Sequence, residues 1–170
     1  PFVYMSALGD YNDQNQPFSP IYKIQNQPIS IVDQYGKEDY RPENFDGKTG
    51  GEKTLREGLK GSVNLIAVRL IQSILREDCI DLNNNKCCEG SEPFYDENQN
   101  GKLDSGEKMR GPNKVKYLAE NFGIKSDIAP GEALALGSSA VYPLEMTAAY
   151  STIANNGILM EPNYIYKIEN

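Results

Sequence analysis

Residues 54–72 read TLREGLKGSVNLIAVRLIQ, and this stretch predicts two helices joined by a short break. Thr54 and Glu57 form a T-x-x-E capping box, in which the hydroxyl and the carboxylate satisfy free amides of the first helical turn. A Gly-Ser pair then interrupts the helical pattern. From Asn64 onward the apolar positions are Leu65, Ile66, Val68, Leu70, Ile71, Ile74 and Leu75. Because they cover most of a helix surface, this second helix is expected to be buried on nearly all sides.

Weaker signals on either side of this stretch predict further elements. Apolar residues at Pro1 to Leu8 indicate a helix, and residues 10–51, rich in Asn, Gln, Pro and Asp, indicate a long extended connection. Two more helices are expected from helical spacing and end signals, one from Val115 to Phe122 and one from Pro143 to just before Gly157. Strands are expected at Ile29 to Val32 and at Asn163 to Glu169. The fold class predicted from these elements is α+β, predominantly α.

Composition places the chain in the soluble globular class and excludes several functions. The 170 residues are 39% hydrophobic and 24% charged, which fits one ordinary domain. A net charge of -7 argues against nucleic acid as a partner. There is no run of about 18 apolar residues, so no transmembrane segment is expected. With no histidine in the chain, catalysis by a Ser-His-Asp or Cys-His arrangement is excluded.

Two short motifs match those of serine-acylating, penicillin-binding enzymes. Lys48, Thr49 and Gly50 spell K-T-G, but the flanking glycines predict a turn where a functional K-T-G needs a strand edge. A chance tripeptide is therefore the preferred interpretation. Ser62 and Asn64 spell S-x-N at the helix break, where a hydroxyl and a carboxamide can project into one cavity. The alternative for this pair is an ordinary Ser/Asn cap of the following helix.

Three segments together resemble the transpeptidase domain of class A, or bifunctional, penicillin-binding proteins in order and spacing. They are PFVYMSAL at the start, the run from Tyr40 to Gln72, and ALALGSSAVYPLEMTAAYSTIANNG from Ala133 to Gly157. The resemblance implies the helical part of the fold shared by DD-peptidases and β-lactamases. It departs from the family at Gly58, where Ala is common, and at Tyr142, where Thr or Ser would cap the next helix.

The resemblance implies a serine-type D,D-transpeptidase that cross-links peptidoglycan stem peptides and binds β-lactams. Ser62 and Asn64 would be its S-x-N, with Ser62 shuttling a proton near the nucleophile and Asn64 binding the substrate's amide. No cofactor is implied for catalysis. Such a protein would be anchored in the bacterial cytoplasmic membrane through a segment outside this sequence, and would act in the periplasm or on the outer face.

The same resemblance implies that residues 1–170 form a central part of that domain. The Lys of S-x-x-K would directly precede Pro1, and the family's own K-T-G would follow the strand that begins at Asn163. We therefore expect these residues alone to be inactive. The expected division is 1–77 and 113–170 as two parts of the transpeptidase domain, with an insertion at 78–112.

The insertion contains DENQNGKLDSGE, which fits the 12-residue calcium loop of EF-hands. Its expected ligands are Asp96, Asn98, Asn100, Lys102 through its carbonyl, Asp104 and Glu107. We expect a structural Ca²⁺ here; the alternative is an acidic solvated loop with an Asn-Gly turn. Cys79, Cys87 and Cys88 precede the loop, and they fit either one local disulfide or free thiols.

Two other functions are open at this stage. One is a non-catalytic, extracytoplasmic calcium-binding or adhesion module in which S-x-N is only a helix cap. The other is a hydrolytic relative, a D,D-carboxypeptidase or β-lactamase, which the long segment between T-L-R-E and S-x-N disfavours. Neither the oligomeric state nor the acceptor amine follows from the sequence.

Overall fold

The computed structural model describes residues 1–8, 10–12, 16–32, 38–74 and 111–163. The helices are α1 (Phe2–Ala7), α2 (Leu55–Lys60), α3 (Asn64–Ser73), α4 (Gly111–Asn121), the 3-10 helix η1 (Glu132–Leu136) and α5 (Pro143–Ala154). The strands are β1 (Lys23–Gln25), β2 (Ile31–Val32), β3 (Glu38–Tyr40) and β4 (Glu52–Thr54). This part of the chain is helix-rich with little sheet, as its sequence predicts.

The strands form two small antiparallel pairs along the connection between α1 and α2. β1 pairs with β4, with Ile24 opposite Lys53, and β2 pairs with β3. Residues 10–51, which were expected to form an extended connection, therefore take part in two strand pairs. The expected strand at residues 29–32 is shorter than predicted, since β2 begins at Ile31.

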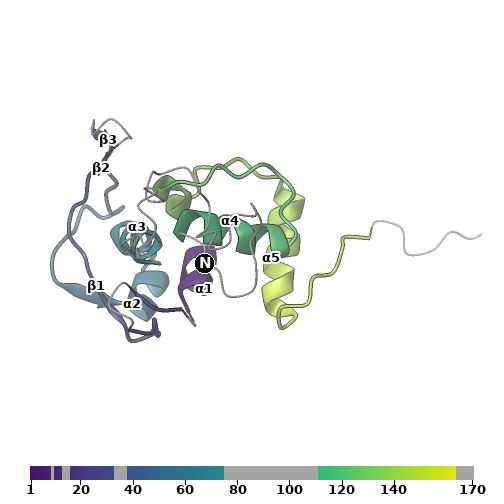
Figure 1. The fold of residues 1–170 in the computed structure, drawn as a ribbon, viewed down its shortest axis with the longest axis horizontal. Coiled ribbons are helices and arrows are strands. Elements are labelled where there is room, and N and C mark those ends of the chain that lie inside the picture. Colours follow the sequence, from purple (N-terminus) through teal and green to yellow (C-terminus); the bar gives the residue numbers. More distant parts are fainter. Residues whose placement is uncertain (9, 13–15, 33–37, 75–110, 164–170) are drawn as a thin grey trace, which may run out of the picture.

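Helix α3 is the centre of the larger hydrophobic core. Leu65, Ile66, Leu70 and Ile71 are each at most 1% exposed. Helices α1, α2, α4 and η1 all contact α3, and so does β1 (Figure 1). The prediction that this helix is buried on nearly all sides is confirmed, because five other elements cover its apolar surface.

Helix α4 begins earlier than its apolar spacing indicates. Gly111 and Pro112 form its first turn, because proline is compatible with the start of a helix. The Lys114 ammonium group makes an ion pair with the Asp10 carboxylate, which ties α4 to the segment after α1. Helix α5 begins at Pro143, as predicted.

Several sequence predictions fall outside the described residues. They are the three cysteines, the calcium loop at Asp96 to Glu107, and most of the strand expected at Asn163 to Glu169. Among the residues that are described, no cluster of three metal-ligating side chains is found. Within the same ranges, no helix has the length and apolar content needed to cross a bilayer.

Candidate active site

The turn between α2 and α3 carries the S-x-N pair, and both of its flanking helices are fixed. The capping box at the start of α2 is present, since the Glu57 amide donates to the Thr54 hydroxyl and the Thr54 amide donates to the Glu57 carboxylate. The Thr54 amide, and after it the Thr54 hydroxyl, which also donates to the Glu57 carboxylate at 2.8 Å, hold the pKa of this exposed carboxyl below its usual value. At the other end of α2, the Val63 amide donates to the Gly58 carbonyl at 2.9 Å.

Ser62 has a left-handed backbone conformation, with φ of +50°. For a residue with a Cβ this conformation costs roughly 1 to 2 kcal/mol. Such a residue persists where its surroundings dictate the conformation, and such positions cluster at functional sites. Ser62 is exposed and is one of the residues that line a cavity.

Asn64 is the first residue of α3, and its amide nitrogen Nδ2 donates to the Glu43 carbonyl at 2.8 Å. The N-cap position of α3 is occupied by Val63, which has no side chain able to cap. The Leu65 amide is instead bound by the Asn44 side chain, at 3.0 Å. Neither residue of S-x-N therefore acts as the ordinary cap that the alternative interpretation requires.

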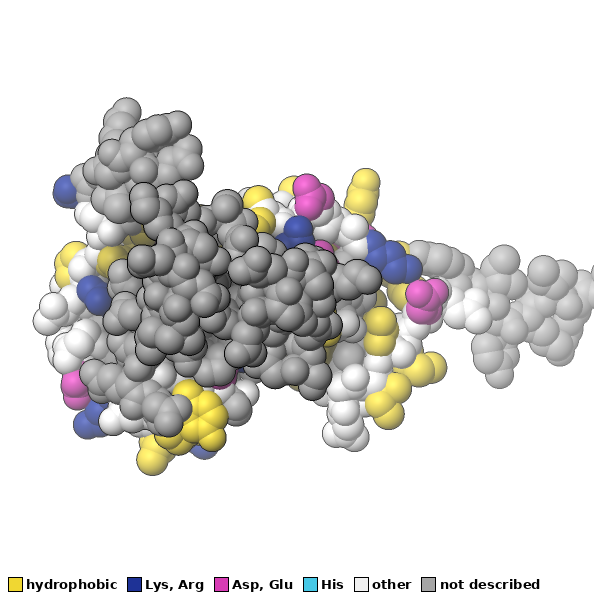
Figure 2. Space-filling model, in the orientation of Figure 1, with side chains coloured by type: hydrophobic (Ala, Val, Ile, Leu, Met, Phe, Trp, Pro, Cys, Tyr) yellow, Lys and Arg dark blue, Asp and Glu magenta, His cyan; other side chains and the backbone are white. Residues whose placement is uncertain are grey.

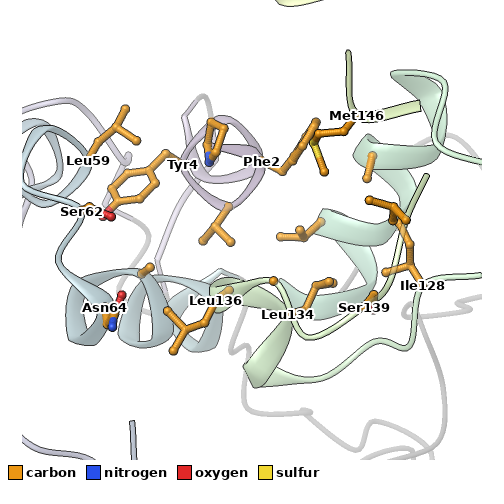
Figure 3. A pocket seen from close by; sticks show the side chains of 18 of the residues that line it. Phe2, Tyr4, Leu59, Ser62, Asn64, Ile128, Leu134, Leu136, Ser139 and Met146 are labelled. Carbon is orange, nitrogen blue, oxygen red and sulfur yellow. The ribbon is translucent and has the colours of Figure 1, made fainter. Parts of the chain in front are cut away.

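Ser62 and Asn64 line one cavity of about 370 Å³ together with the first residues of the chain. Figure 3 shows Tyr4 reaching from α1 toward Leu59 and Ser62, with Asn64 on the adjacent helix. The remaining wall is mostly apolar and comes from α4, η1 and α5, through residues such as Ala119, Leu134, Leu136 and Met146. The cavity thus joins S-x-N to the chain's first residue, Pro1.

Tyr4 is a polar group of this cavity that sequence patterns did not single out. Burial raises the pKa of its phenol to about 12, so the hydroxyl stays protonated at neutral pH. Its oxygen lies 2.8 Å from the point where a Cβ on Gly58 would be. Ile66 Cγ2 lies even closer to that point, at 2.6 Å, so the Ala that the resemblance leads us to expect at position 58 would fit only if these side chains moved.

The K-T-G tripeptide lies elsewhere. Residues 47–50 form no strand, and Gly47 and Gly50 both have positive φ values, as expected of a turn. Gly47 and Thr49 line a second cavity, of about 520 Å³, which Asn44 and Leu65 also line. The prediction of a turn at K-T-G is confirmed, and the tripeptide is not among the residues that line the cavity with S-x-N.

Comparison with known proteins identifies the family. The family model for the penicillin binding protein transpeptidase domain matches residues 14–170. The chain belongs to the penicillin-binding protein transpeptidase family. The resemblance found in the sequence is thereby confirmed.

Individual relatives agree with this assignment. Penicillin-binding protein 1A of Rickettsia felis is 29% identical over 168 residues, covering 99% of this chain and 16% of the relative. The crystal structure of penicillin-binding protein 1A from Haemophilus influenzae aligns with a TM-score of 0.66 and 28% identity, over 96% of this chain and 18% of that one. The transpeptidase-family chain thus spans about a sixth of the length of such relatives.

A more distant structure supports the fold. The penicillin-binding protein PonA1 from Mycobacterium tuberculosis aligns with a TM-score of 0.60 at 21% identity, covering 95% of this chain and 33% of that one. The fold is that of penicillin-binding transpeptidase domains, as predicted, while the calcium-binding insertion stays a prediction.

Proposed function

We propose that residues 1–170 are part of a peptidoglycan D,D-transpeptidase domain in which Ser62 and Asn64 belong to the active site. The observation that carries the proposal is that both side chains line one cavity with Pro1. By the resemblance, the lysine of S-x-x-K would directly precede that residue. The nucleophile and its base would then enter the cavity beside S-x-N.

The proposed reaction forms and breaks one acyl bond in each half. The serine oxygen attacks the carbonyl carbon of D-Ala-D-Ala while the lysine amine accepts its proton, and the terminal D-Ala leaves as an amine that must gain a proton. Ser62 is suited to relay that proton. The amine of a neighbouring stem peptide then attacks the acyl-enzyme ester: the new amide bond forms the cross-link, the ester bond to the serine breaks, and the proton lost by the amine passes to the freed serine oxygen.

The displayed geometry supports a role for Asn64 in orienting substrate. Its Nδ2 is held by the Glu43 carbonyl, which fixes the plane of the carboxamide. A carboxamide has a second N–H and a carbonyl oxygen, so Asn64 can still bind a peptide group of the substrate. The same site would bind β-lactams, which mimic the D-Ala-D-Ala substrate.

Labelling with a fluorescent penicillin tests this proposal. A protein carrying residues 1–170 within a complete transpeptidase domain should form a covalent adduct at the serine of S-x-x-K, identified by peptide mass spectrometry. Residues 1–170 alone should form none. Ser105 to Lys108 also spells S-x-x-K, but it follows S-x-N in the chain, so an adduct at Ser105 would contradict the assignment.

We further propose that the complete protein acts outside the cytoplasm, anchored in the membrane, because stem peptides are cross-linked in the cell wall. Its catalysis needs no cofactor, since serine and lysine supply nucleophile and base. Fractionation of cells expressing the complete protein tests this, and recovery in the soluble cytoplasm would refute it.

Calcium binding by Asp96 to Glu107 is proposed on the sequence pattern, in which six ligand positions and the central glycine agree. The ion would order the insertion and take no part in acylation. Titration calorimetry should detect Ca²⁺ binding that is lost when Glu107 is changed to Gln. No binding at several times the roughly millimolar affinity of weak extracellular sites would refute it.

A further inference from the structure

The first turn of α3 obtains its cap from a distant loop. The Leu65 amide, one of the amides that a helix start leaves without an internal partner, donates to Asn44 Oδ1 at 3.0 Å. Asn44 lies 21 residues earlier in the chain. The position of the helix that begins with Asn64 is therefore set by a side chain outside the α2–α3 segment.

Asn44 is itself held rigidly. Its Nδ2 donates to Asn26 Oδ1 at 2.8 Å and to the Lys48 carbonyl at 2.7 Å. Asn44 is 7% exposed and Asn26 is 3% exposed. In such a buried place each of these polar groups would be costly to leave unpaired. The turn that contains K-T-G thus closes around Asn44 and fixes its orientation.

The residue next to Asn44 holds Asn64 directly. The Glu43 carbonyl accepts from Asn64 Nδ2 at 2.8 Å. Two successive residues of one loop therefore bind two successive residues of α3, one through a side chain and one through a backbone carbonyl. A shift of Asn44 would move both contacts together.

We propose that Asn44 is a positioning residue for S-x-N: it aligns Asn64, and with it the strained turn at Ser62, for acylation. This inference rests on the proposed function. Asn44 does not line the cavity that contains Ser62 and Asn64, so it acts through α3 and not by touching substrate. The turn at K-T-G then has a role in the site without being its K-T-G.

The chain offers a matched control in Asn12. This asparagine is also 7% exposed, and its side chain also bonds several partners, among them the Tyr22 hydroxyl and the side chain and amide of Gln16. None of these partners belongs to the α2–α3 segment. Asn44→Ala and Asn12→Ala therefore remove similar buried networks, but only the first removes the cap of α3.

The test uses the protein with its complete transpeptidase domain. The acylation rate constant with a fluorescent penicillin is measured for Asn44→Ala and Asn12→Ala well below the melting temperature of each. We expect Asn44→Ala to slow acylation by about tenfold to a hundredfold, the range that small misplacements of catalytic groups cause. Asn12→Ala should change the rate by less than about threefold at a similar loss of Tm. Equal slowing by both variants, or none by Asn44→Ala, would overturn the proposal.

Hydrogen exchange gives a second readout that does not depend on activity, and its measurement on the unmodified protein does not depend on a folded variant. The Leu65 amide should be protected in the unmodified protein, and Asn44→Ala should accelerate its exchange while Asn12→Ala does not. Fast exchange of Leu65 in the unmodified protein would overturn the proposal even if Asn44→Ala fails to fold. Failure of the unmodified protein to react with penicillin would instead count against the proposed function, because the exchange result does not depend on acylation.

Discussion

Helices α3 and α5 have similar apolar content, but the described structure surrounds only one of them. In α3 the large side chains Leu70 and Ile71 are 0% exposed. In α5, Leu144 is 42% exposed and Tyr150 is 49% exposed. Figure 2 shows exposed apolar side chains at the α5 end of the molecule, among other places. In the segment after α5, Ile158 is 62% exposed and Met160 is 63% exposed.

The difference distinguishes two parts of the site: α3, which holds Asn64, and α5, which only lines the cavity. Helix α3 begins with Asn64 and is packed on several sides, which suits an element that must hold a catalytic side chain in a fixed geometry. Helix α5 contributes Met146 and Tyr150 to the rim of the cavity. It is buried only through Ala148, Ala149 and Thr152. The predictions below test this contrast.

Matched truncations should show the largest contrast. Leu70→Ala removes a buried side chain of α3 and should lower the free energy of unfolding by about 3 kcal/mol. Leu144→Ala removes a half-exposed side chain of α5 and should cost at most about 1 kcal/mol. Urea unfolding of the 170-residue chain measures both values, and similar costs at the two positions would remove the contrast.

The contact of α3 with α4 depends on a glycine. A Cβ at Gly111 would lie 1.8 Å from the Ile71 carbonyl oxygen. This clash can be relieved only if the backbone of α3 or α4 moves. Gly111→Ala should therefore destabilise the protein by about 2 to 3 kcal/mol. Gly131, which has no atom within 4 Å of its Cβ position, provides the control. Thermal melts should show Gly131→Ala close to the unmodified protein, and a tolerated Gly111→Ala would mean that α4 packs differently.

The cap of α2 should have a smaller, pH-dependent effect. Thr54→Ala removes a capping side chain and should cost about 1 kcal/mol at neutral pH. Because the folded pKa of Glu57 is lowered, the carboxylate stabilises the fold above its unfolded pKa, and this contribution is lost as pH falls through the folded pKa. Thr54→Ala removes the hydroxyl that donates to this carboxylate but keeps the backbone amide, so urea unfolding at neutral and acidic pH should show the cost shrinking in acid only by the part that the hydroxyl contributes. In Glu57→Gln, which cannot titrate, the cost of Thr54→Ala should stay constant with pH.

Relief of strain at Ser62 should give the smallest change in stability, and of opposite sign. Glycine adopts positive φ without steric cost, so Ser62→Gly should stabilise the fold by up to about 1 kcal/mol. Ser62→Ala retains a Cβ and should not. If both variants have the same melting temperature, Ser62 is not strained.

Local patterns in the sequence were sufficient for the helices, but long-range contacts were not visible in it. The capping box at Thr54 and the proline start of α5 involve residues a few positions apart, so spacing reveals them. The cap of Leu65 by Asn44 joins residues 21 positions apart, and no local pattern encodes it. Asn44 lies in the P-E-N-F-D-G run that carried part of the family resemblance. That resemblance was the only feature of the sequence that pointed to Asn44.

The site was predicted in part for the same reason. Ser62 and Asn64 could be matched to a motif, whereas Tyr4 reaches the cavity through the packing of α1 against α3 and α4. The left-handed backbone at Ser62 also could not be foreseen, because serine is not a residue that favours it.

The most direct test of the account compares Ser62→Ala with the unmodified protein in a complete transpeptidase domain. Fluorescent-penicillin acylation should fall by about a hundredfold or more, since proton transfer by a positioned side chain contributes on that scale. Ser151→Ala, which changes an exposed serine of α5, should leave the rate unchanged. An acylation rate unaffected by Ser62→Ala in a folded protein would contradict the assignment of S-x-N to the active site.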